Sequence, residues 1–305
     1  MRIIEDFKKH DKKIRYSIKK FGHYAEHNFF HYMYWQTSGD KNLFFDYGKG
    51  RGMLIQYNQK SNIWKLFPSG VLAPENERLE LLLHATKHIL HKRKGKKFIL
   101  DVSEPLRKQI VQELSPGNGI AVSTYSKVFY CPTYNMKGWD PELSGGEMKK
   151  LRNIRNRFYK TFNVKVKDCK EVPKEDLRNI VFNWIKNRSG NDRVDEEYYL
   201  NLIENNFKGF EIAKTICVNG KPTAITGGWK IPNSKNYYSA VGIIDYSYQG
   251  LGELANVDDL NRLKDEGYEH VDFGGSEKNL LKFKKKFKPE KIYKTYQFSI
   301  LRRDA

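Results

Sequence analysis

The sequence predicts an α+β protein made of two similar halves, each a mixed, mostly antiparallel sheet flanked by helices. Runs with the two-residue alternation of β-strands are interleaved with segments whose apolar residues recur at helical spacing. The order of these elements in residues 42–130 returns in residues 211–300, at an offset of roughly 170 residues, as expected for a duplicated domain. The 305 residues are enough for two domains of ordinary size.

The second half has the clearer pattern. Asn219-Gly220 between two alternating runs favours a tight hairpin. Gly267 suits the left-handed position after a helix, and Ser276 suits the position before one. The predicted elements, in chain order, are a strand at 164–166, helices from 174 and from 195, strands at 211–218, 222–231 and 237–245, a helix ending at Gly267, a strand at 270–273, a helix after Ser276 and a strand at 292–300.

The first half repeats this order. Its predicted elements are strands at 42–47, 52–57 and 63–67, a helix at 79–90, a strand at 98–102, a helix at 104–114 and a strand at 122–130. Residues 131–146 are rich in Pro, Gly and Asp and are interpreted as a connector, and a basic helix follows at 147–162. We therefore predict an N-terminal domain at 1–140 and a C-terminal domain at 141–305, the second carrying the active site.

The composition indicates a basic protein of a reducing compartment. The formal net charge of +19 and the pI near 9.6 favour polyanionic partners such as RNA, anionic lipid or a phosphate-rich cofactor. Generic use of Lys for solubility is the alternative, because Lys is spread along the whole chain. The three cysteines have neither a disulfide nor a zinc pattern. No apolar run approaches the length that spans a bilayer, so we expect a cytoplasmic protein without a transmembrane segment.

Two segments resemble a known family. Residues 149–158, KKLRNIRNRF, resemble a basic helix in the catalytic domain of phosphatidylglycerol lysyltransferases. Residues 271–276, VDFGGS, with 280–287, LLKFKKKF, resemble a strand-to-helix segment shared by that family and the Fem-type peptidyltransferases. Both groups are tandem GNAT acyltransferase folds, so the resemblance implies two GNAT domains. It also implies transfer of an aminoacyl or acyl group to an amine or hydroxyl acceptor.

The phosphate-binding candidates lie at helix starts and in basic segments. Gln249, Gly250 and Gly252 stand between the third strand and the long helix of the second half, where a GNAT protein cradles the coenzyme A pyrophosphate on backbone N–H groups. Ser247 stands where the usual signature has Arg or Gln, so the match is partial, and an ordinary turn is the alternative. The other candidates for binding the donor or its phosphates are Arg152, Arg155, Gly274, Gly275, Ser276, Lys282 and Lys285.

The catalytic candidates are Asp245, Tyr248 and Asp272, which lie at strand ends or in loops beside the expected cleft. Transfer to an amine needs a base to take its proton. Asp272 has a structural hydrogen bond at a strand end as its alternative role. The histidines at 23, 27 and 31 and at 84, 88 and 91 have helical spacing but lack the other features of zinc sites, so we expect no metal.

We predict an aminoacyl transferase that takes its group from charged tRNA, holds no bound cofactor and gives the group to a small molecule, a peptide or a lipid headgroup. Its basic charge also allows peripheral contact with a membrane surface. An acyl-CoA-dependent N-acyltransferase is one alternative, supported by Gly250 and Gly252. A non-catalytic tandem GNAT scaffold that binds RNA or protein is another.

Overall fold

The computed structural model describes residues 1–36, 39–114, 119–188 and 194–303. The first half contains, in chain order, β1 (Arg2–Ile4), α1 (Phe7–Phe21), α2 (Phe29–Tyr34), β2 (Asp40–Gly48), β3 (Arg51–Asn58), β4 (Ile63–Leu72), α3 (Arg78–Lys87), β5 (Lys97–Ser103), α4 (Glu104–Glu113), β6 (Ile120–Val122) and β7 (Lys127–Asn135). A 3₁₀ turn, η1 (Glu75–Glu77), precedes α3, and a π-helical turn, η2 (His88–Lys92), follows it.

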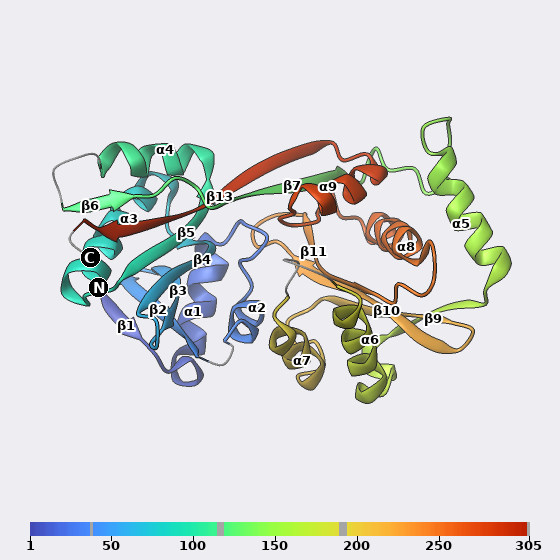
Figure 1. The fold of residues 1–305 in the computed structure, drawn as a ribbon, viewed down its shortest axis with the longest axis horizontal. Coiled ribbons are helices and arrows are strands. Elements are labelled where there is room, and N and C mark those ends of the chain that lie inside the picture. The colour runs from blue at the N-terminus through green and yellow to red at the C-terminus, as the bar shows by residue number, and fades with distance from the viewer. Residues whose placement is uncertain (37–38, 115–118, 189–193, 304–305) are drawn as a thin grey trace.

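The second half contains α5 (Lys149–Thr161), β8 (Val164–Asp168), the 3₁₀ turn η3 (Cys169–Glu171), α6 (Lys174–Lys186), α7 (Glu196–Glu204), β9 (Ile212–Val218), β10 (Lys221–Lys230), β11 (Tyr237–Ile244), α8 (Leu251–Asp265), β12 (His270–Asp272), α9 (Lys278–Lys284), the 3₁₀ turn η4 (Lys285–Phe287) and β13 (Lys291–Arg302). The predicted order of elements recurs in both halves (Figure 1). Among these helices none is both long and apolar enough to cross a membrane.

All of these strands belong to one continuous sheet. Its order is β1-β2-β3-β4-β5-β13-β7-β12-β11-β10-β9-β8, and β6 pairs with β13 beside this path. The pairs β4–β5 and β11–β12 are parallel, and the other pairs are antiparallel. Each parallel pair is joined by a crossover helix, α3 in the first half and α8 in the second, so the two halves share one topology.

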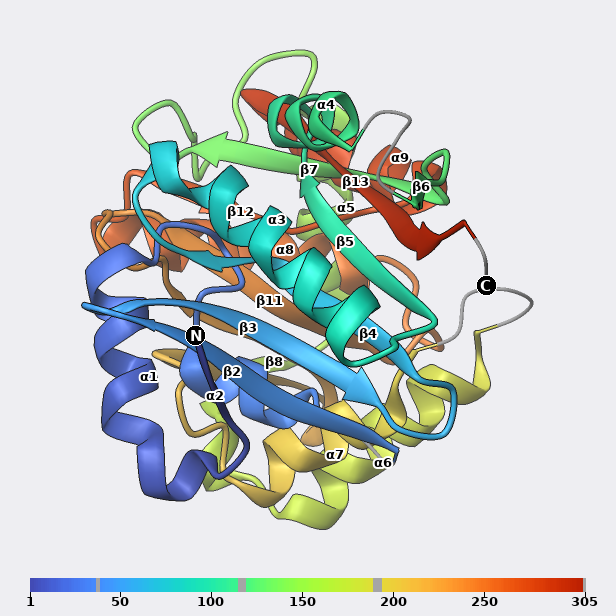
Figure 2. The ribbon, with the colours of Figure 1, turned by 90° about the vertical axis from the view of Figure 1, so that its left-hand side faces the viewer.

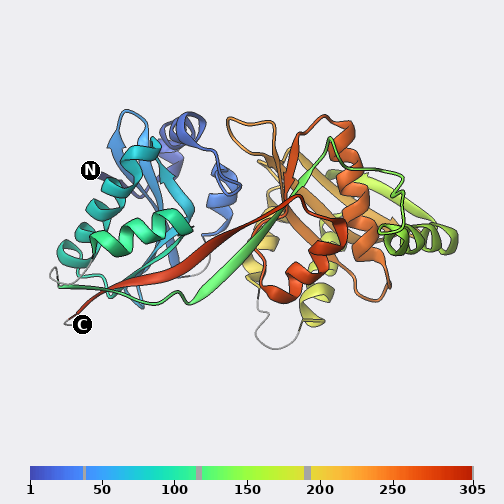
Figure 3. The same ribbon diagram turned by 90° about the horizontal axis from the view of Figure 1, so that it is seen from above.

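The two halves exchange their last long strands. β13, which ends the second half, pairs with β5 of the first half, and β7, which ends the first half, pairs with β12 of the second. The two exchanged strands also pair with each other from Lys291 to Gln297. Figure 3 shows β7 and β13 running side by side from one half to the other. The division at residue 140 therefore stays a prediction about folding units, because the sheet is continuous across it.

Helices cover both faces of the sheet in each half. In β2, Phe44 packs in the cluster that contains α1 and α2, and the next residue, Phe45, packs in the cluster under α3. Figure 2 shows α3 and α1 on opposite sides of these strands. In β10, Ile225 packs against α6 and α7, whereas Ala224 packs against α8. This alternation follows from the two-residue period of a strand.

Buried polar contacts hold the two halves together. The imidazole of His31 in α2 lies 2.8 Å from the hydroxyl of Tyr198 in α7, and both side chains are buried. The indole N–H of Trp229 donates to the carbonyl oxygen of Ala25 at 2.8 Å. The hydroxyl of Tyr34 donates to the carbonyl oxygen of Lys208 at the same distance. The halves therefore meet through an aromatic, hydrogen-bonded contact as well as through the sheet.

Replacing Tyr198 by Phe is expected to lower the free energy of unfolding by about 1–3 kcal/mol, because the His31 ring nitrogen that faces it loses its partner in a buried setting. Chemical denaturation measures the loss. Tyr16→Phe is the matched control, since this side chain is 54% exposed, and it should change stability by less than about 0.5 kcal/mol. Equal values for the two variants would contradict the prediction.

Several details differ from the sequence prediction. The elements β1, α1 and α2 have no predicted counterpart. The expected strand at 122–130 is split into β6 and β7, and β7 continues to Asn135, into the expected connector. Glu277, not Ser276, stands at the N-cap of α9. Ser276 instead forms an antiparallel bridge with Tyr130 of β7. Its backbone N–H donates to the Tyr130 carbonyl oxygen, and its carbonyl oxygen accepts from the Tyr130 N–H, so Ser276 belongs to the turn before α9.

Candidate active site

A cavity of about 1810 Å³ lies in the second half, where β11 and β12 separate. The two strands pair at Tyr237↔Val271 and Tyr238↔Asp272 and then diverge. Beyond these pairs, Ser239, Ala240, Gly242 and Ile244 of β11 line the opening. A parallel pair that separates in this way leaves room for a ligand between its strands.

A β-bulge marks the point of divergence. The register between β10 and β11 shifts between Gly227 and Gly228, which leaves Ala240 as the extra residue of β11. A bulge bends its strand and increases the local twist, and it therefore turns β11 away from β12. Gly228 is needed at the bulge, because a Cβ placed there would overlap the carbonyl oxygen of Tyr238.

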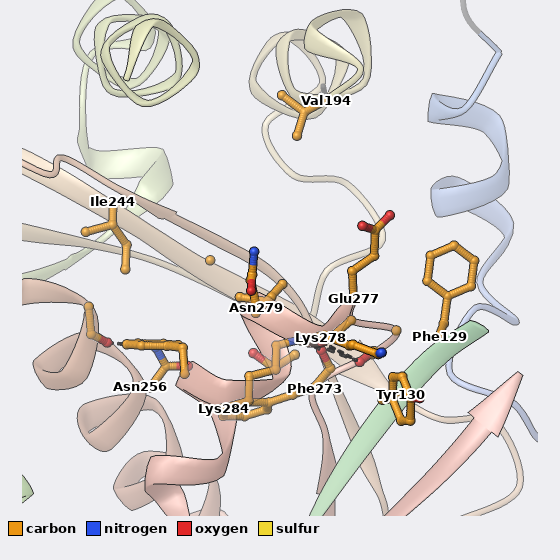
Figure 4. A pocket seen from close by; sticks show the side chains of 18 of the residues that line it. Phe129, Tyr130, Val194, Ile244, Asn256, Phe273, Glu277, Lys278, Asn279 and Lys284 are labelled. Atoms are coloured by element: carbon orange, nitrogen blue, oxygen red, sulfur yellow. Dashed lines mark hydrogen bonds between the residues drawn. The ribbon is translucent and has the colours of Figure 1, made fainter. Parts of the chain in front are cut away.

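The cavity reaches both faces of the sheet. Trp184 and Tyr199, from α6 and α7, line it on one face, while Asn256 of α8 and Phe283 of α9 line it on the other. The exchanged strand β7 supplies a further wall with Phe129 and Tyr130, which Figure 4 shows beside the α9 residues. Both halves of the chain therefore build this one cavity.

Lys284 lies at the floor of the cavity. Its ammonium group donates to the backbone carbonyl oxygen of Phe273 and lies 3.4 Å from that of Gly274, so it is held over the turn that follows β12 (Figure 4). Burial disfavours the charged form and lowers the pKa of Lys284 to about 8. Roughly a tenth of this amine is therefore neutral at pH 7 and about half at pH 8, and a neutral amine can accept a proton.

Asp272 supports the turn from below the cavity. It is 6% exposed, and its carboxylate accepts hydrogen bonds from the Gly274 N–H and from the Tyr293 hydroxyl, each at 2.7 Å. Burial raises the pKa of Asp272. Burial and the nearby Asp272 carboxylate raise the pKa of Glu26, from the first half, to about 8. Glu26 therefore lies close enough to Asp272 for the two carboxylates to repel each other.

The predicted catalytic residues are not brought together. Tyr248 lines the cavity, whereas Asp245 and Asp272 do not. Asp245 accepts hydrogen bonds from the Ser247 N–H at 3.0 Å and from the Ser247 hydroxyl at 2.7 Å, which holds the turn before α8. Asp245 and Asp272 therefore each accept a hydrogen bond from a backbone N–H group in the turn that follows their strand.

The predicted glycines line the cavity, and at three of them a neighbouring side chain leaves little room for a Cβ atom. Gly250, with φ +93°, is approached by Ile154 of α5, which would lie 2.9 Å from a Cβ at that position. A Cβ on Gly252 would lie 3.3 Å from the ring of Phe283. Gly274, with φ +68°, would place a Cβ 2.7 Å from the Tyr238 hydroxyl oxygen. Three further predicted residues, Gln249, Gly275 and Ser276, also line the cavity.

The predicted cations lie elsewhere. The guanidinium of Arg152 donates to the carbonyl oxygens of Leu143 and Gly145, and that of Arg155 donates to the carbonyl oxygen of Pro141 at 2.6 Å. These bonds hold the turn before α5. Neither arginine lines the cavity, and neither do the exposed side chains of two other candidates, Lys282 and Lys285.

Five basic side chains line the cavity, and none of them is among the selected donor-binding candidates; they are Lys127, Arg188, Lys278, Lys284 and Lys286. Lys284 had a detectable signal. It stands three residues after Leu281, the buried residue of α9, and therefore lies on the inward face of the helix, whereas Lys282, one residue after Leu281, does not. Arg188 and Lys127 had no such signal, because their place depends on the packing of distant elements.

Solved structures with the same architecture include L-PGS from Bacillus licheniformis, at 15% identity and TM-score 0.65, with 96% of this chain and 92% of that chain covered. FemX matches at 12% identity and TM-score 0.64, with 100% and 98% covered. A tandem GNAT protein from the clavulanic acid biosynthesis pathway matches at 10% identity and TM-score 0.58, with 99% and 98% covered. These likenesses confirm the predicted fold class of two tandem GNAT domains.

The comparison with curated protein sequences finds no match. The family described as phosphatidylglycerol lysyltransferase, C-terminal, matches residues 19–298, which is nearly the whole chain and includes both segments that carry the resemblance. The chain therefore belongs to the phosphatidylglycerol lysyltransferase C-terminal family, and it is a GNAT-fold transferase.

Proposed function

We propose that this protein transfers an aminoacyl group from charged tRNA to an amine or hydroxyl acceptor in the cavity between β11 and β12. The family and its structural neighbours support aminoacyl-tRNA-dependent transfer. The observation that carries the proposal is one cavity, lined from both faces of the sheet, with the amine of Lys284 at its floor. Two substrates can then approach one point from opposite sides.

In the proposed reaction the acceptor attacks the carbonyl carbon of the aminoacyl ester. A new amide or ester bond forms, the bond from the carbonyl carbon to the ribose oxygen breaks, and the ribose leaves as an alcohol. Neutral Lys284 takes the proton of the attacking group and, as an ammonium, returns a proton to the ribose oxygen. The pKa of about 8 suits both steps, since neither form of the amine is scarce near neutral pH.

One feature at the start of α8 favours tRNA over acyl-CoA as the donor. A pyrophosphate needs open backbone N–H groups at a helix N-terminus, but Ile154 packs over Gly250. Acyl-CoA stays the second candidate, because Gly250 and Gly252 do line the cavity. A cavity of this volume disfavours the third reading, a scaffold without substrates.

The basic surface suits a tRNA. The outward side of α5, next to the start of α8, exposes Lys149, Lys150, Arg157 and Lys160. Such a surface neutralises RNA phosphates, so binding should weaken steeply with added salt. We place the reaction in the cytoplasm, where charged tRNA occurs, and the three buried cysteines are unpaired, as expected in a reducing compartment. The acceptor is a small molecule, a peptide or a lipid headgroup.

Radiolabel from a charged tRNA pool is expected to pass to an acceptor fraction of a cell extract when the protein is added. Prior RNase treatment should abolish the labelling, and a rise from 50 to 200 mM salt should lower it by about tenfold or more. A parallel assay uses radiolabelled acyl-CoA in place of charged tRNA. Labelling from acyl-CoA that resists RNase would overturn the proposal in favour of the second candidate.

A further inference from the structure

The cavity has more cations than carboxylates. Five basic side chains line it, namely Lys127, Arg188, Lys278, Lys284 and Lys286. Among the lining residues that the structure describes, Glu253 and Glu277 are the carboxylates. Each of these two already forms an ion pair with a lysine of the same cavity. Basic side chains thus outnumber carboxylates among the described residues that line the cavity.

The inner of the two ion pairs joins Glu253 and Lys286 at 2.7 Å. Glu253 stands in the first turn of α8, and its side chain is 15% exposed, whereas Lys286 follows α9 in η4. The ammonium of Lys286 also lies 4.8 Å from the centre of the Phe283 ring, which attracts cations. Two contacts thus hold Lys286 against the Glu253 carboxylate.

The outer ion pair joins Glu277 and Lys127 at 2.8 Å. Both side chains are more than half exposed, so water screens their charges. This pair lies at the rim of the cavity and contributes less to what a bound group would meet inside. Whether the cavity accepts a positively charged aminoacyl side chain therefore depends mainly on whether Lys286 neutralises the Glu253 carboxylate.

We infer that the aminoacyl group taken by this cavity has a side chain without a positive charge, and that the Glu253–Lys286 ion pair enforces this choice. A lysyl ammonium in the cavity would meet five basic side chains against two carboxylates, and it would find the inner carboxylate occupied by Lys286. The inference rests on the proposed function. It separates this chain from the lysyl transfer in the name of its family.

Binding of RNA minihelices tests the inference. An acceptor-stem minihelix is charged at its 3′ end with alanine, lysine or Nε-acetyllysine, the last of which keeps the length of lysine without its charge. We expect the protein to bind the alanyl and acetyllysyl minihelices at least about tenfold more tightly than the lysyl minihelix. Equal affinity for lysyl and acetyllysyl minihelices would overturn the inference.

Two variants test whether the Glu253–Lys286 ion pair causes the discrimination against lysine. Lys286→Met frees the Glu253 carboxylate and should remove most of the roughly tenfold discrimination against lysine. Adding Glu253→Gln to that variant should restore the discrimination, because the freed carboxylate is then gone. Lys285→Met is the control and should behave as the wild type, since Lys285 is exposed and outside the cavity. Discrimination that survives Lys286→Met unchanged would also overturn the inference.

Failure of the proposed function gives a different result. If charged minihelices of all three kinds bind no better than the uncharged one, the cavity does not hold an aminoacyl group, and both proposals are overturned. If all three bind better than the uncharged minihelix but equally well, the inference alone is overturned. The uncharged minihelix therefore belongs in every experiment.

Discussion

Replacing Lys284 by Met is expected to lower the rate of aminoacyl transfer by about 100-fold or more, because the reaction loses its proton acceptor. The methionine side chain keeps most of the lysine stem, and the lost hydrogen bond to the Phe273 carbonyl oxygen should cost about 1–3 kcal/mol, which is less than the stability of most domains. The fold should therefore survive, and the far-ultraviolet circular dichroism spectrum and the melting temperature check this. Turnover of charged tRNA with a saturating acceptor measures the effect.

The pH dependence of the rate tests the role of Lys284 separately. The neutral amine is the active base, so kcat/KM of the wild type should rise with pH and level off above about pH 8. Lys284→Met should lose this rise, and Lys284→Arg should not rescue it, because a guanidinium stays charged. Lys282→Met is the matched control, exposed and outside the cavity. An equal loss in Lys282→Met would mean that surface charge, and not the floor of the cavity, governs turnover.

Gly228→Ala is expected to lower the free energy of unfolding by about 3 kcal/mol or more. Its Cβ would overlap the carbonyl oxygen of Tyr238 across the β10–β11 pair, and a backbone atom cannot move aside as the end of a side chain can. The bulge at Ala240 would have to shift, and the opening between β11 and β12 with it. Chemical denaturation measures the loss of stability.

Gly242→Ala is the control for this prediction. Gly242 lies in β11, close to the bulge, and a Cβ added there meets nothing within 4 Å. The free energy of unfolding should change by less than about 0.5 kcal/mol. A similar loss in both variants would show that neither β10 nor β11 tolerates a side chain at its glycine, and the special role of Gly228 at the bulge would then be rejected.

The fold class followed from the sequence because each element has a local pattern. Asn219-Gly220 forms the expected hairpin turn, with φ +50° and +83°, and Gly267 takes the left-handed position after α8, with φ +80°. The strand exchange had no such signal. β5 and β13 are far apart in the chain, and an alternating strand carries no information on which edge it will pair with.

The site was predicted less completely than the fold. Glycines beside the cavity were found because each is required by a turn or a close approach. Charged residues were assigned by their motif, and a motif does not report the direction of a side chain. Arg152 belongs to the segment that carries the family resemblance, yet its guanidinium is taken up by the carbonyl oxygens of a neighbouring turn. Lys284 could have been separated from Lys282 by helical phase, but its pKa depends on burial.

The exchange of β7 and β13 has a consequence for the order in which the protein is made. During synthesis the first half leaves the ribosome with one side of β5 unpaired, since its partner there, β13, is the last strand of the chain. An unpaired strand edge is prone to pair with other chains until its own partner arrives. The sheet of the first half is thus completed only after the second half has been translated, and nascent chains would need protection at β5 for that interval.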